Sequence, residues 1–109
     1  MTDRELIEAA AKAGGMPPWT WDEESGCINC QHRSDLTNMH FWNPLTDDGD
    51  ALRLAVKLDL GVEVMLSLGE TRAGDGDQEP VAERHNGEPC AATRRAIVRA
   101  AAAIGGHPA

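Results

Sequence analysis

Residues 46–68 read Thr-Asp-Asp-Gly-Asp-Ala-Leu-Arg-Leu-Ala-Val-Lys-Leu-Asp-Leu-Gly-Val-Glu-Val-Met-Leu-Ser-Leu, and this stretch decides the fold class. Its first half predicts a helix with Thr46 as the N-cap, because apolar side chains recur over a broad arc before Gly61. Its second half, Val62 to Leu68, alternates as a β-strand does. The helical arc consists of Ala51, Leu52, Leu54, Ala55, Val56 and Leu58. So wide an apolar arc predicts a helix buried on more than one side, between a sheet and another element.

The N-terminal residues 2–13 are predicted to form another helix. Thr2 and Glu5 have the spacing of a capping box, in which each side chain accepts a hydrogen bond from the other residue's backbone N–H. The apolar residues that follow fall on one side at 100° per residue. Gly14 and Gly15 come next, and we expect them to end the helix.

Residues 19–32 are predicted to form a β-hairpin. Trp19 to Trp21 follow two prolines and place both indoles on one side of an extended segment. A turn at Glu24-Ser25-Gly26 would pair this segment with Cys27 to His32. Residues 33–41 show no clean period, and we expect a flexible loop there.

The C-terminal residues are predicted to complete a second hairpin and a third helix. Residues 69–78 are rich in Gly and Asp, which favours a flexible connection. Val81 to His85 follow a proline and contain charged residues, which is typical of a strand at a sheet edge. The last helix spans about Ala91 to Ile104, and residues 105–109 form a tail.

The predicted elements follow the order αββαββα in a single domain over residues 1–109. This order predicts an α+β fold in which a small antiparallel sheet is sandwiched between helices. A length of 109 residues fits one compact domain. Leu, Ile, Val and Phe account for only 19 residues while the net charge is −8, so we expect a thin core.

The composition also narrows the classes of protein. An excess of acidic residues argues against binding of a phosphate backbone by the whole surface. The sequence has no apolar run that could span a membrane and no signal-peptide pattern at its N-terminus. Three cysteines, two of them close together, do not indicate a disulfide framework. We therefore expect a protein of a reducing cytoplasm.

A weak metal motif lies in the predicted hairpin. Cys27 and Cys30 have a spacing that allows two thiolates to bind one Zn²⁺, and His32 and His40 would complete a tetrahedron. A strong motif would contain a second cysteine pair or an ordered histidine pair. We therefore expect free thiols and no cofactor, and a zinc-stabilised domain is the alternative.

Three acidic residues, Asp47, Asp48 and Asp50, lie where the second helix is predicted to begin. They do not form a calcium loop, because no glutamate falls six residues after Gly49. Their carboxylates are expected to interact with the helix dipole, and they are also candidates for contact with a partner. Trp42 precedes them, and it is either a contact for a partner or a cover over the start of the helix.

The only basic cluster is Arg94, Arg95 and Arg99 on the last helix. From Ala91 onward the chain has these three basic residues and no acidic one. Two interpretations remain open. The arginines either form a solvated helix face that offsets the acidic body, or they contact phosphates or a partner, with tryptophans as stacking platforms.

Two blocks carry a resemblance to a known family. They are Trp-Asn-Pro-Leu-Thr-Asp-Asp-Gly-Asp-Ala-Leu-Arg-Leu-Ala-Val-Lys-Leu at 42–58 and Ala-Thr-Arg-Arg-Ala-Ile-Val-Arg-Ala-Ala at 92–101. With the opening helix at Thr2-Asp-Arg-Glu5, they resemble the phage ABA-sandwich domain of small phage and prophage proteins. The resemblance implies a sheet between helices. It implies no catalytic residues, cofactor or substrate.

The sequence contains no nucleophile elbow, Walker loop, dinucleotide-binding motif or zinc-protease motif, so we expect no enzymatic activity. The resemblance and the charge predict a phage accessory protein in the cytoplasm of the bacterial host. We expect it to bind a host factor or defence component, or a phage protein, through an acidic surface. The alternative is a small nucleic-acid or nucleotide-binding module that uses the Arg94, Arg95 and Arg99 face.

Overall fold

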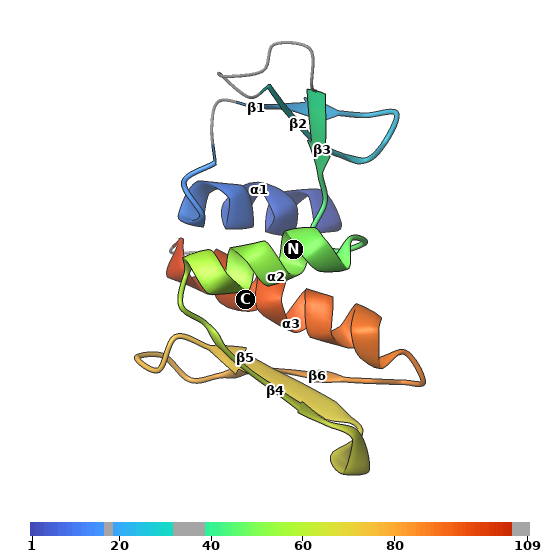
Figure 1. Ribbon diagram of the computed structural model, residues 1–109, viewed down its shortest axis with the longest axis vertical. Helices are drawn as coiled ribbons and strands as arrows, with labels where there is room; N and C mark the ends of the chain where they lie inside the picture. Colours follow the sequence, from blue (N-terminus) through green and yellow to red (C-terminus); the bar gives the residue numbers. More distant parts are fainter. Residues whose placement is uncertain (17–18, 32–38, 106–109) are drawn as a thin grey trace.

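A computed structural model of the protein describes residues 1–16, 19–31 and 39–105. Within these ranges the chain forms three α-helices, six strands and one short 3₁₀ helix (Figure 1). The helices are α1 (Asp3–Ala13), α2 (Asp48–Lys57) and α3 (Pro89–Ile104). The strands are β1 (Trp19–Asp22), β2 (Cys27–Gln31), β3 (Met39–Trp42), β4 (Gly61–Met65), β5 (Glu70–Gly74) and β6 (Val81–Arg84). The 3₁₀ helix η1 (Leu66–Leu68) links β4 to β5.

The strands form two separate antiparallel sheets, one ordered β1-β2-β3 and the other β4-β5-β6. The three helices lie between these sheets, with the first sheet above them and the second below in Figure 1. The predicted α+β class is confirmed. The predicted layering is wrong, because in the described residues the helices are the middle layer and the sheets are outside.

The layering was mispredicted because two strands lie in segments that lack a strand-like pattern. Residues 70–74, expected to be part of a flexible connection, form the central strand β5. Its buried positions are Thr71 and Ala73, which are too small and too polar to signal an apolar alternation. Residues 39–41 belong to β3 and not to a loop, while residues 33–38 and 106–109 lie outside the described residues.

Most of the other predicted elements are confirmed, with shifted ends. The capping box at α1 is present, with Thr2 Oγ1 accepting from the Glu5 N–H at 3.1 Å. The first hairpin pairs Trp19 with Cys30, and β6 is an outer strand as expected. The predicted strand over 62–68 ends at Met65, where η1 begins.

The N-cap of α2 is Asp47 and not Thr46. Asn43 explains the shift, because its carbonyl accepts from the N–H groups of both Thr46 and Asp47 and holds these residues in a turn. The Asp47 carboxylate then accepts from the Asp50 N–H at 2.8 Å. The helix therefore begins one residue later than the sequence pattern indicates.

The main core lies where the three helices meet the first sheet. Ile7 of α1, Ile28 of β2 and Val98 of α3 are fully buried there. A second, smaller cluster joins α3 to the other sheet through Ala73, Ala96 and Ala100. Alanine lets α3 approach a neighbour on each side, because it projects only a methyl group.

The predicted burial of α2 on more than one side is wrong. Leu52 and Val56 are 63% and 72% exposed, whereas Leu54 and Ala55 are buried. The helix contacts α3 on one side, and its other apolar side has no cover in the described residues. None of the described helices combines the length and the apolar character that a membrane crossing requires.

The N-cap assignment can be tested by substitution. We expect Asp47→Ala to lower the free energy of unfolding by about 1 kcal/mol, because the Asp50 N–H loses its acceptor. Thr46→Ala should change it by less than about 0.5 kcal/mol, since Thr46 is exposed and does not cap the helix. Urea denaturation measures both variants. Asp47→Asn, which keeps the cap, is the control, and a larger loss for Thr46→Ala than for Asp47→Ala would contradict the assignment.

Candidate functional site

An apolar groove of about 400 Å³ lies between α2, β4 and the start of α3. We call it the α2–β4 groove. Most of its lining is aliphatic. Its main apolar residues are Ala51, Leu52, Val62, Val64, Leu66 and Ile97.

The groove exists because α3 does not cover the whole of the second sheet. In the β4–β5 register Val62 lies opposite Ala73 and Val64 opposite Thr71. Ala73 and Thr71 are buried, so this side of the sheet faces the helices. Helix α3 packs on β5 and β6 and touches β4 much less. Val62 and Val64 therefore face the helical layer and still remain 38% and 48% exposed.

Three polar residues that line the groove, Asp48, Thr93 and Arg94, already have partners within the chain. The Arg94 guanidinium donates to the Asp48 carboxylate at 2.6 Å and to the Leu45 carbonyl at 2.8 Å. Thr93 Oγ1 lies 2.8 Å from Thr71 Oγ1, which in turn lies 2.8 Å from Nε2 of the buried His85. With these groups engaged, what the groove offers a ligand is mainly apolar contact.

The predicted acidic candidates have structural partners. Asp47 caps α2, and Asp48 holds Arg94. Asp50 is only 2% exposed, and its carboxylate accepts from the Asn43 N–H at 3.0 Å and from Arg53 at 2.8 Å. These contacts join the start of α2 to the end of β3.

The three arginines of α3 do not share one free surface. Arg94 donates to Asp48, the first residue of α2, Arg95 donates to Asp3 of α1 at 3.0 Å, and Arg99 donates to Glu83 of β6. Each guanidinium therefore connects α3 to a different neighbour. The interpretation as a helix face that offsets acidic charge fits this arrangement better than a phosphate-binding patch.

Trp42 is 4% exposed and belongs to the main core. Burial leaves its ring no open face on which a base or a partner side chain could stack. Trp21 is partly buried, and the Arg4 guanidinium lies 5.0 Å from the centre of its ring. The sequence interpretation of Trp42 as a cover over the start of α2 fits its burial.

The structure describes only part of the predicted zinc motif. Cys27 is a buried free thiol 2.9 Å from Ser25 Oγ. Cys30 and His40 are backbone partners across β2 and β3. His32 lies outside the described residues. Among the side chains that the structure describes, no group of three metal-ligating residues comes together.

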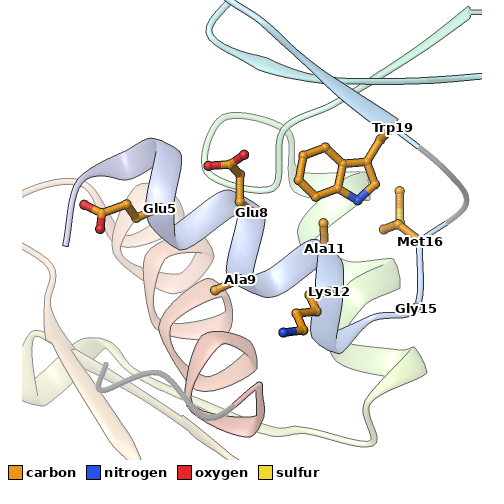
Figure 2. Close-up of a pocket in the computed structure, with 8 residues that line it drawn as sticks. All are labelled: Glu5, Glu8, Ala9, Ala11, Lys12, Gly15, Met16 and Trp19. Atoms are coloured by element: carbon orange, nitrogen blue, oxygen red, sulfur yellow. The ribbon is translucent and has the colours of Figure 1, made fainter.

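A second cleft, of about 520 Å³, lies between α1 and β1. Figure 2 shows Glu8 and Trp19 on one side of α1, while Lys12 points the other way. Glu8 pairs with Arg4, and Glu5 belongs to the capping box. This cleft is more polar than the α2–β4 groove, and the carboxylates of Glu5 and Glu8 already form contacts within the chain.

No family model matches the chain, and no curated protein or solved structure matches it either. The similarity to the phage ABA-sandwich domain therefore remains a prediction that rests on the two blocks and the opening helix. The layering that this similarity implies is the reverse of the one observed in the described residues.

The sequence did not identify the groove. Its apolar residues were predicted, but as members of the core. The sequence signal for the groove is the large number of apolar residues on α2. Leu52 and Val56 widen the apolar side of this helix beyond what one packed element can cover. Only the position of α3 shows which of these positions remain exposed.

The hydrogen-bonded chain behind the groove gives a stability prediction. We expect Thr71→Val to lower the free energy of unfolding by about 1–3 kcal/mol, because His85 and Thr93 both lose a hydrogen-bond partner. Thr20→Val on the exposed side of β1 is the matched control and should cost less than about 0.5 kcal/mol. Equal losses for the two variants in urea denaturation would contradict a role for this chain in stability.

Proposed function

We propose that the chain is a non-enzymatic protein that acts by binding another protein through the α2–β4 groove. The supporting observation is that Leu52, Val62, Val64 and Leu66 are exposed around one groove. Neighbouring exposed apolar side chains rimmed by polar residues are typical of protein interaction sites. Val56 lies four residues after Leu52 and extends the same side of α2.

The acidic charge of the chain bears on the choice of partner. A net charge of −8 attracts basic proteins and increases their rate of encounter at low salt. The groove would then supply the affinity for the partner, and the negative charge would steer the partner toward the chain. The resemblance to the phage family favours a host factor or defence component, or a phage protein, as this partner in the bacterial cytoplasm.

The nucleic-acid alternative has less support. It needs a free basic face, and Arg94, Arg95 and Arg99 each donate to a carboxylate of the same chain. Phosphate binding would have to break these pairs. Arg94 also donates to the backbone carbonyl of Leu45, so its guanidinium is held in place twice.

The proposed function predicts that a charge placed in the groove abolishes partner binding. Leu52→Asp should lower the amount of captured partner at least about tenfold, because a carboxylate would have to lose its water at an apolar contact. Leu52 is exposed, so the substitution leaves the core intact. The measurement is quantitative mass spectrometry of proteins captured from bacterial lysate by the tagged chain.

Phe41→Asp is the matched control, because Phe41 is an exposed apolar residue on the other sheet. It adds the same charge and should leave the capture of the partner unchanged. Capture of the same proteins in the same amounts by wild type and both variants would overturn the proposal.

A further inference from the structure

Among the residues that the structure describes, strand β4 forms an unpaired sheet edge beside the groove. It pairs with β5 on one side only, so half of its backbone N–H and C=O groups point away from the sheet. Natural edge strands are commonly protected by charged side chains, above all lysine, by proline or by a bulge. The outer strand β6 follows Pro80 and contains Glu83 and Arg84, whereas Gly61-Val-Glu-Val-Met65 has no proline and a single charged residue, Glu63.

The side chains next to this edge leave space for one more strand beside β4. Val62 and Val64 face the helical layer and line the groove, and Leu52 of α2 lines it as well. A strand placed beside β4 would direct every second side chain into the groove. Its backbone would meet the free edge of β4 at the same time.

Glu63 determines the charge that such a strand needs. It lies on the opposite side of β4 from the groove, across from Arg72 in the register. Arg72 donates to Glu70 at 2.7 Å, and Glu63 forms no ion pair with another described residue. Opposite charges placed across neighbouring strands stabilise a sheet. The residue beside Glu63 on an added strand is therefore favoured to be Lys or Arg.

The charge of the chain also argues against a second copy of itself as the occupant. Two copies would each bring a net charge of −8 to the contact, and pairing of β4 with β4 centred on Glu63 would place two carboxylates opposite each other. A helix in the groove would leave the backbone edge of β4 unpaired. A basic extended segment satisfies the edge, the groove and Glu63 together.

We propose that the α2–β4 groove binds an extended segment of a partner protein that adds to the second sheet beside β4. Alternate apolar side chains of this segment fill the groove, and the intervening Lys or Arg residues lie beside Glu63. This inference rests on the proposed function and names the kind of partner segment.

The test uses the full chain and a fluorescent ten-residue peptide of alternating Val and Lys. In a strand the N–H groups of alternate residues point to opposite edges. Two N-methylated peptides, one modified at every Val and one at every Lys, therefore remove the hydrogen bonds of opposite edges at constant charge. One of the two should bind at least about tenfold more weakly in fluorescence anisotropy, and the other should stay within about threefold of the parent.

Glu63 gives a second arm of the test. Glu63→Lys should weaken binding of the Val-Lys peptide about threefold to tenfold and strengthen binding of a Val-Glu peptide. Glu24→Lys, at an exposed position in the turn between β1 and β2, changes the net charge equally and should have little effect. Addition of the Val-Lys peptide to the wild-type chain should also slow hydrogen exchange of amides within residues 61–65.

Equal binding of the two N-methylated peptides, or equal effects of Glu63→Lys and Glu24→Lys, would overturn strand addition. A dimer in sedimentation equilibrium that itself protects the 61–65 amides would overturn it in favour of a second copy. If the peptide experiments contradict strand addition while Leu52→Asp still abolishes capture of the partner, only the inference of strand addition is refuted. If Leu52→Asp leaves capture unchanged, the proposed function fails instead.

Discussion

The central constraint in this protein is that α3 must pack on both of its sides. Ala96 packs toward the second sheet, whereas Val98 packs in the main core with α1. Both residues are fully buried. The chain has few large apolar residues with which to fill a core. Alanine residues on α3 instead let the neighbouring elements pack close to the helix. The helices consequently form the middle layer, and in the described part of the chain each sheet has helices on one side.

The same constraint accounts for the exposed apolar side chains. A single helix cannot cover three strands evenly, and α3 lies over β5 and β6. Val62 and Val64 therefore remain open beside β4, and Leu52 faces the same space from α2. A chain with so few large apolar residues places several of them at its surface. This placement is what supports a binding role.

Sequence reasoning was most accurate where the determinants are local. The capping box of Thr2 and Glu5 and the end of α1 near Gly14 depend on residues within one or two turns. The sequence pattern did not predict β5. Its inward residues Thr71 and Ala73 are small, because α3 lies against them, and so they give no apolar alternation. The arginine face was also ambiguous, since its carboxylate partners come from distant parts of the chain.

The sequence by itself determined the α+β class, the three helices and the acidic balance of the chain, because periodicity, caps and charge are properties of short segments. Tertiary structure alone decided that the helices lie between two sheets and that Arg94, Arg95 and Arg99 are paired. It also decided that β4 is an outer strand of the second sheet, unpaired on one edge among the described residues. These features depend on which surfaces face each other, and a pattern along one segment does not specify its neighbour in space.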